Sequence, residues 1–133
     1  MKIFAICMLL FGLSCNGSKN LTKQEAMTEL AGIYNVTAMG SENVSGSSMT
    51  LKFDPETAAV GGSSSCNKIF GSYSAEGETM SFSAMGMTKM YCEGKMQMEK
   101  DFMQALQAVN KYRIKGDQIE LLQDKTVLLT LSK

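Results

Sequence analysis

The stretch "GGSSSCNKIFGSYS", residues 61–74, joins a polar loop to an alternating apolar segment. Cys66 and Asn67 end the loop, and "IFGSYS" follows with the period-two pattern of a β-strand. A cysteine beside an asparagine is compatible with a nucleophile, a metal ligand or one half of a disulfide. The rest of the chain has to decide among these three roles.

Short alternating segments lie on both sides of this stretch and predict strands joined by tight turns. Gly61 and Gly62, in contrast, weaken any regular strand at the start of the stretch. The predicted strands are "GIYNVTAM" (32–39), "MTLKF" (49–53), "IFGSYS" (69–74), "TMSFSAM" (79–85), a hairpin "KYRIKGDQIELL" (111–122) and "DKTVLLTL" (124–131).

Two segments have helical patterns instead. Thr22 and Glu25 have the spacing of a capping box that opens a short helix toward Leu30. Apolar residues between Met98 and Val109 recur at the spacing of an amphipathic helix. The predicted fold class is therefore mainly β, antiparallel, with one principal α-helix packed on or across the sheet. Closure into a small barrel would remove exposed strand edges.

The N-terminus has the order of a secretory signal: Lys2, an apolar run to Leu13, and Ser14 before Cys15. The apolar run is shorter than the roughly 20 residues that a membrane-spanning helix needs. Cys15 stands where bacterial lipoprotein signals place the acylated cysteine, although the usual leucine three residues earlier is Gly12 here. We predict a signal peptide at 1–14, a lipidated N-terminus and tether at 15–28, and one domain at 29–133. Ordinary cleavage and free secretion is the alternative.

The cysteine count then favours a disulfide. Cys7 leaves with the signal and Cys15 carries the lipid, so Cys66 and Cys92, 26 positions apart, remain in an oxidising compartment. A nucleophilic Cys66 would need a base, and the chain contains no histidine. Two cysteines without histidine also cannot complete a structural zinc site. No catalytic residue, metal site or cofactor is predicted from these residues.

Charge argues against nucleic acid as a partner. The chain has 13 basic and 13 acidic residues, and removal of residues 1–15 takes one lysine and no acid, which leaves a net charge of −1. A nucleic-acid-binding domain presents a basic face, and this composition offers none.

Two blocks at a fixed separation, "GGSSSCNKIFGSYS" and "MSFSAMGMTKMYC", followed by Glu99 and "FMQAL", resemble the signature of the META-domain family, the HslJ-like bacterial envelope lipoproteins. The resemblance implies a small antiparallel pseudobarrel or buckled sheet with one helix, no agreed catalytic activity, and a "CN" loop close to the "MTKMYC" block. It also implies that Asn67 serves the turn through an unusual backbone angle or a local hydrogen bond. The matching positions are Cys66, Asn67, Gly71, Tyr73, Met87, Thr88, Met90 and Cys92.

Two functional hypotheses follow. The first is a non-enzymatic lipoprotein, lipid-anchored at the periplasmic face of the outer membrane, that binds an unknown envelope protein or small ligand or supports stress tolerance. The second is a periplasmic Cu(I)-binding protein, because thioether and thiolate ligands suit Cu(I), although methionine also fills irregular cores. The methionines near Cys92 that raise this alternative are Met85, Met87, Met90, Met96, Met98 and Met103.

Overall fold

Alternating apolar residues form strands where the sequence predicts them. Strand β1 (Gly32–Met39) covers the predicted segment 32–39, and it buries Tyr34 and Val36 on one face. Side chains on alternate positions of a strand point to opposite faces, so this strand supplies one apolar row to the interior.

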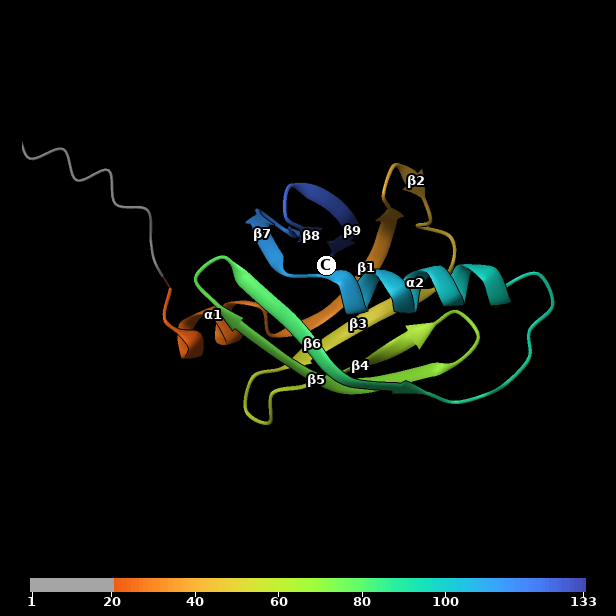
Figure 1. The fold of residues 1–133 in the computed structure, drawn as a ribbon, viewed down its shortest axis with the longest axis horizontal. Helices are drawn as coiled ribbons and strands as arrows, with labels where there is room; N and C mark the ends of the chain where they lie inside the picture. The colour runs from red at the N-terminus through yellow and green to blue at the C-terminus, as the bar shows by residue number, and fades with distance from the viewer. Residues whose placement is uncertain (1–20) are drawn as a thin grey trace, which may run out of the picture.

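The structure is a computed structural model that describes residues 21–133 (Figure 1). The predicted signal peptide and Cys15 lie outside the described residues.

The described residues form one antiparallel sheet of nine strands, in the order β2-β1-β3-β4-β5-β6-β7-β8-β9. Helix α1 (Lys23–Glu29) precedes the first strand, and helix α2 (Met96–Ala108) connects β6 to β7. The other strands are β2 (Glu42–Asn43), β3 (Met49–Asp54), β4 (Ala59–Ser64), β5 (Lys68–Glu76), β6 (Thr79–Met87), β7 (Lys111–Lys115), β8 (Gln118–Gln123) and β9 (Thr126–Ser132).

The sheet curls back on itself without forming a complete barrel. Strand β1 pairs with β3 along its first half and with β9 along its second half, so the two ends of the strand order meet. Strands β6 and β7, in contrast, share a single ladder pair, Thr79 with Lys111. The prediction of a mainly β fold with one principal helix is confirmed, and a seam between β6 and β7 interrupts the ring.

The interpretation that Gly61 and Gly62 weaken any regular strand at this point is wrong. Strand β4 contains both glycines and pairs with β3 on one side and β5 on the other. Gly62 has φ 151°, and a Cβ at this position would overlap the carbonyl oxygen of Thr50. Glycine is therefore required here because the neighbouring backbone approaches closely, not because the chain turns.

Irregularities displace some residues from their predicted face. The alternation in "TMSFSAM" places Met80, Phe82 and Ala84 together, but Ala84 is exposed and has φ 51°. The ladder between β5 and β6 shifts register nearby, between Phe70 and Ser72. A bulge of this kind turns the following side chains relative to the pleat, so the simple alternation ends there.

Helix α1 packs onto the domain. Thr22 and Glu25 form the predicted capping box, and the helix buries Ala26 and Met27. The N–H of Gly77 donates to the carbonyl oxygen of Leu21 at 2.9 Å, which ties the start of the described chain to the β5–β6 turn. The packed unit therefore begins before residue 29, where the sequence places the start of the domain.

Phe53 is the centre of an aromatic cluster in the core. Its ring centroid lies 4.9 Å from that of Tyr73, 5.9 Å from that of Tyr34 and 6.2 Å from that of Phe82. Edge-to-face pairs at such distances add to the stabilisation from buried apolar area. Helix α2 contributes Phe102 and Leu106 to the same core, as its predicted apolar stripe requires. None of the helices among residues 21–133 has the length and apolarity to span a membrane.

Candidate functional site

The "CN" loop between β4 and β5 closes on itself through Ser64 and Asn67. The N–H of Ser64 donates to the carbonyl oxygen of Asn67 at 2.9 Å. The N–H of Asn67 in turn donates to the Ser64 Oγ at 3.0 Å. The positive φ in this turn belongs to Ser65, at 82°, and not to Asn67. The unusual backbone angle that the resemblance assigned to Asn67 is therefore absent.

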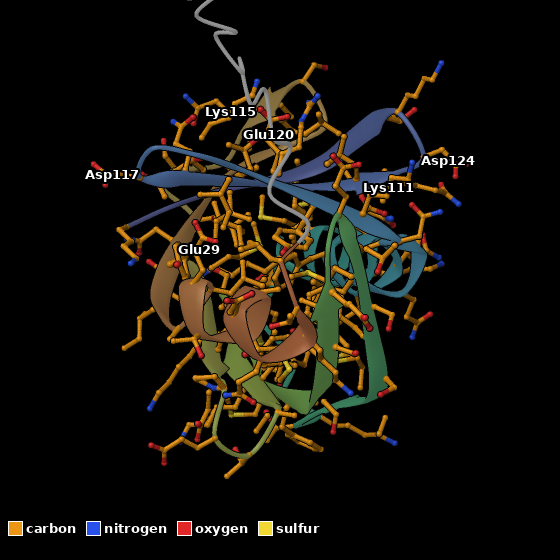
Figure 2. All side chains as sticks on the ribbon, turned by 90° about the vertical axis from the view of Figure 1, so that its left-hand side faces the viewer. Glu29, Lys111, Lys115, Asp117, Glu120 and Asp124 are labelled. Carbon is orange, nitrogen blue, oxygen red and sulfur yellow. A yellow bond between two sulfur atoms is a disulfide. The ribbon has the colours of Figure 1, made fainter. Side chains whose placement is uncertain are left out.

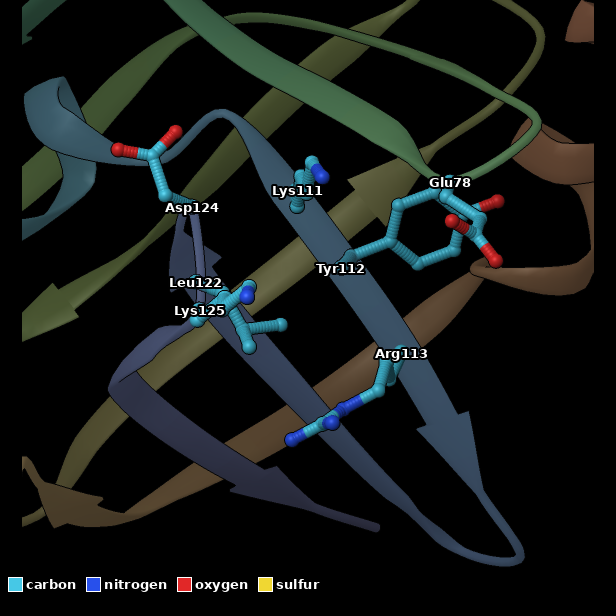
Figure 3. A pocket seen from close by; sticks show the side chains of 7 residues that line it. All are labelled: Glu78, Lys111, Tyr112, Arg113, Leu122, Asp124 and Lys125. Atoms are coloured by element: carbon cyan, nitrogen blue, oxygen red, sulfur yellow. The ribbon is translucent and has the colours of Figure 1, made fainter.

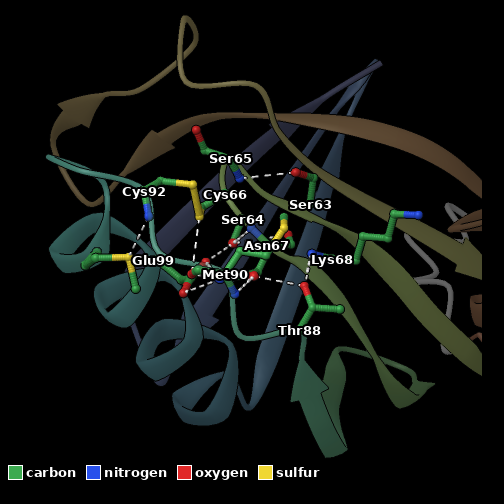
Figure 4. The surroundings of a disulfide bond; sticks show 11 residues. Ser63, Ser64, Ser65, Cys66, Asn67, Lys68, Thr88, Met90, Cys92 and Glu99 are labelled. Carbon is green, nitrogen blue, oxygen red and sulfur yellow. Dashed lines mark hydrogen bonds between the residues drawn. A yellow bond between two sulfur atoms is a disulfide. The ribbon is translucent and has the colours of Figure 1, made fainter.

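The side chain of Asn67 instead connects distant parts of the chain (Figure 4). Its Oδ1 accepts from the N–H of Met90 at 2.7 Å and from the Thr88 hydroxyl at 2.9 Å. Its Nδ2 donates to the carbonyl oxygen of Met90 at 3.1 Å and to both Glu99 carboxyl oxygens, at 2.9 and 3.0 Å. Asn67 is 2% exposed and uses its full hydrogen-bonding capacity.

Glu99 lies in the first turn of α2, and its carboxyl group is buried against the loop. It is 2% exposed, and it accepts from the hydroxyl of Ser64 as well as from Asn67. An acidic side chain is favoured near a helix N-terminus, and buried polar groups need partners. The three side chains of Ser64, Asn67 and Glu99 therefore form a closed polar network, which we call the Asn67 network.

Cys66 and Cys92 form a disulfide next to this network, which confirms the predicted pair. Their Cα atoms are 5.9 Å apart, within the limit of roughly 7 Å that a disulfide requires. The disulfide and the Asn67 side chain thus join the same two segments, the β4–β5 loop and residues 88–92. In this form neither sulfur is available as a thiolate ligand or nucleophile.

The remaining positions of the sequence motif have structural roles that can be assigned from their contacts. Thr88 accepts from the N–H of Lys68 at 3.0 Å through its hydroxyl, next to its bond with Asn67. A Cβ at Gly71 would overlap the Met85 Sδ, so β5 and the Met85 side chain meet only because this position is glycine. Tyr73 packs on Phe53 and donates its hydroxyl to the carbonyl oxygen of Met27 at 3.5 Å.

A pocket of about 370 Å³ opens beside the Asn67 network. Asn67 and Glu99 line it together with the segment that the network holds. Met90 and Tyr91 are exposed at its rim, at 57% and 79%. The backbone of Met90 is hydrogen-bonded to Asn67 while its side chain faces solvent. The lining residues are Asn67, Met87, Thr88, Lys89, Met90, Tyr91, Met96 and Glu99.

The six methionines that raised the hypothesis of a Cu(I) site lie in two different environments. Met87, Met90 and Met96 line this pocket. Met103 is buried in the core, and Met85 and Met98 pack against it. The Sδ of Met96 already accepts from the N–H of Cys92 at 3.5 Å. The sequence cluster is therefore partly core and partly pocket wall.

The sequence placed Glu99 in the family signature but indicated no role for its carboxyl group, and Ser64 was not singled out at all. The available signal was the position of Glu99 within the apolar stripe of α2, three residues before Phe102. An acid on the core-facing side of a helix indicates a buried partner. The partners themselves are 32 and 35 positions away along the chain, so no local pattern identifies them.

Comparisons with known proteins agree with this motif and fold. A family model described as META domain matches residues 26–133. The NMR structure of a protein from Burkholderia xenovorans is 22% identical, covers 94% of this chain and 97% of its own, and has a TM-score of 0.62. The crystal structure of a DUF4847 family protein from Bacteroides vulgatus is 15% identical, covers 77% and 92%, and has a TM-score of 0.57.

At these identities the solved structures share the fold of this chain. None of the curated proteins matches the chain. The family model spans most of the chain and contains the two blocks that form the Asn67 network and the disulfide. The chain therefore belongs to the META-domain family.

Proposed function

We propose that this chain is a non-catalytic binding module, anchored by lipid in the bacterial cell envelope at the periplasmic face of the outer membrane. The META-domain family is not known for an enzymatic activity. The polar groups of the motif support the same view, because Asn67, Ser64 and Glu99 are committed to one another. The two cysteine sulfurs are likewise committed to the disulfide.

The exposed pair Met90 and Tyr91 at the rim of the pocket is the observation that carries the binding role. These side chains extend from a segment that the Asn67 network and the disulfide both hold in place. Tyrosine and methionine are enriched at protein interfaces, and a preorganised segment loses little entropy on binding. The partner we propose is an envelope protein that inserts an apolar side chain between Met90 and Tyr91.

Co-purification from solubilised envelopes tests this role with a matched pair of variants. Tyr91→Ser removes the exposed aromatic side chain of the rim, while Ile33→Ser removes a large apolar side chain, 61% exposed, from β1. We expect one protein to co-purify with the parent and with Ile33→Ser but not with Tyr91→Ser, and to bind again when purified. Equal capture by both variants, or binding only of a small molecule, would contradict the proposal.

The lipid anchor is tested separately by mass spectrometry of the mature N-terminus. We expect cleavage before Cys15 and acyl chains on the new N-terminal cysteine, since several chains bury enough CH₂ groups for stable anchoring. A free, unacylated N-terminus at another residue would instead indicate a secreted soluble protein.

Cu(I) binding is the second candidate, because Met87, Met90 and Met96 line one pocket. Thioethers suit a soft monovalent ion, and the disulfide leaves the methionines as the available sulfur ligands. Titration with Ag(I), which mimics Cu(I), should then saturate at one equivalent in the parent and in Met85→Leu but not in Met90→Leu. Equal titration of all three proteins would exclude the pocket as a metal site.

A further inference from the structure

The seam between β6 and β7 contains a second cleft, on a different part of the molecule from the Asn67 network. Beyond Thr79 and Lys111 the two strands separate, and a cleft of about 510 Å³ lies between α1, the β5–β6 turn and β7. Such a volume is in the usual range for small-molecule sites. Its lining residues are Leu21, Glu29, Gly77, Glu78, Tyr112, Arg113, Ile114 and Lys115.

Tyr112 is the unusual residue of this cleft. It is 4% exposed, and its hydroxyl is buried without a hydrogen-bond partner among the described residues. Figure 3 shows its ring extending from β7 toward Glu78. A buried, unpaired hydroxyl destabilises a fold unless another molecule supplies the partner.

The two cations beside Tyr112, Arg113 and Lys115, share a single carboxylate partner, Glu120, which balances one of their two charges. Arg113 and Lys115 both contact Glu120, at 2.5 and 2.7 Å. Figure 3 shows the guanidinium group of Arg113 directed away from the ring of Tyr112. Together with the lining residues Glu29 and Glu78, the charged groups in and beside the cleft are three carboxylates and two cations, a net charge of −1 that favours a cationic ligand.

The two carboxylates that line the cleft, unlike the cations, have no partner among residues 21–133. Glu29, at the end of α1, and Glu78, in the β5–β6 turn, make no hydrogen bond or ion pair through their side chains with any residue in 21–133. Figure 2 shows Glu29 at the end of α1, below the β7–β8 hairpin. Burial and then the charge of Glu29 raise the pKa of Tyr112, which keeps the phenol neutral.

We propose that this cleft binds a small primary alkylammonium ligand, with the ammonium group between Glu29 and Glu78 and the Tyr112 hydroxyl, and with the alkyl chain against Leu21 and Ile114. Three N–H donors match two carboxylates and one phenol oxygen. The apolar side chains give the chain of the ligand a surface to cover.

NMR titration of the ¹⁵N-labelled protein with n-hexylammonium tests the proposal. We expect saturable shifts at the amides of Gly77, Glu78 and residues 112–115. The neutral 1-hexanol and the anionic hexanoate, which have the same tail, should bind at least about tenfold more weakly. Hexyltrimethylammonium should also bind more weakly, because it has the charge without the N–H donors. Equal binding of any of these three probes, or no binding of hexylammonium, would overturn the proposal.

Variants connect the binding to the named groups. Glu29→Gln combined with Glu78→Gln should weaken hexylammonium binding about tenfold or more, while Glu42→Gln, on β2, should leave it unchanged. Tyr112→Phe should weaken binding and at the same time raise the Tm, because it removes the unpaired hydroxyl. A Tyr112→Phe protein that is folded and binds as tightly as the parent would contradict the assignment of the hydroxyl.

Discussion

Asn67 and Glu99 contact each other through the Asn67 amide nitrogen, which lies 2.9 and 3.0 Å from the two carboxyl oxygens of Glu99. This contact joins the β4–β5 loop to the first turn of α2, 32 positions later in the chain. The same amide holds the backbone of Met90 through two further bonds. A single buried side chain therefore positions both the helix and the exposed segment beside it.

Replacement of Asn67 should be strongly destabilising. Asn67→Ala removes every hydrogen bond of the Asn67 side chain, so the Met90 backbone loses these partners and the Glu99 carboxyl group keeps only the Ser64 hydroxyl. We expect a loss of about 3 kcal/mol in the free energy of unfolding, measured by urea denaturation. Asn35→Ala, at an exposed position on β1, should cost less than about 0.5 kcal/mol. Equal losses in the two variants would show that the network contributes nothing to stability.

The disulfide should stabilise the fold independently of the Asn67 hydrogen bonds. Cys66→Ser with Cys92→Ser should lower the free energy of unfolding by about 2 to 5 kcal/mol, because the unfolded chain regains the entropy of the opened loop. The domain should still fold, since Asn67 joins the same segments. Thermal denaturation with and without reductant measures this effect, and a thiol assay should detect no free Cys66 or Cys92 in the untreated protein. A parent protein whose Tm is insensitive to reductant would contradict the expectation.

Two tyrosine-to-phenylalanine variants should change stability in opposite directions. Tyr73→Phe removes the bond to the Met27 carbonyl and should cost about 1 kcal/mol. Tyr112→Phe removes a buried hydroxyl without a partner in residues 21–133 and should gain about 1 kcal/mol. Urea denaturation of both variants gives the comparison. A loss in both would mean that the Tyr112 hydroxyl has a stabilising partner.

Alkaline pH should destabilise the fold through Tyr73. Burial, followed by the charges of Asp54 and Tyr34, raises the pKa of Tyr73 to about 12. The unfolded chain loses this proton near pH 10, whereas the folded protein keeps it. The free energy of unfolding should therefore be independent of this group below about pH 10, fall between about pH 10 and 12, and level out above.

Tyr73→Phe should make this decline shallower, whereas Tyr91→Phe, at an exposed position, should not. Denaturation curves at several pH values between 9 and 12 give the slopes. A parent and a Tyr73→Phe protein with the same slope would rule out Tyr73 as the cause. Tyr112, whose pKa burial also raises, should account for part of the remaining decline.

The alternation of side chains made much of the sheet predictable, because inward residues such as Tyr34 and Val36 of the segment 32–39 are buried as the pattern indicates. Strand β4 was not predicted, because Gly62 is required by the close approach of the Thr50 backbone, which belongs to β3. The bulge at Ala84 likewise depends on the pairing of β5 with β6. Such features arise from contacts between strands and leave no trace in the local pattern.

The sequence allowed the main motif residues of the site to be predicted, but not the hydrogen bonds that connect them. Cys66 and Cys92 could be paired from the compartment and the family resemblance, and Asn67 could be identified as a motif residue. Its actual partners, Met90 and Glu99, come from segments more than 20 positions away, and a turn-forming role was the simpler local interpretation. The cleft beside Tyr112 depends on the separation of β6 from β7, which the sequence does not encode as a motif.

Photo-cross-linking in cells shows whether the segment held by the Asn67 network is the binding surface that we propose. A photoreactive residue is placed at position 91, at the rim of the pocket, or at position 33, on β1, and the adducts are identified by mass spectrometry. We expect one dominant envelope-protein adduct from position 91 and none of that mass from position 33. No adduct at position 91, or the same adducts at both positions, would contradict the proposal.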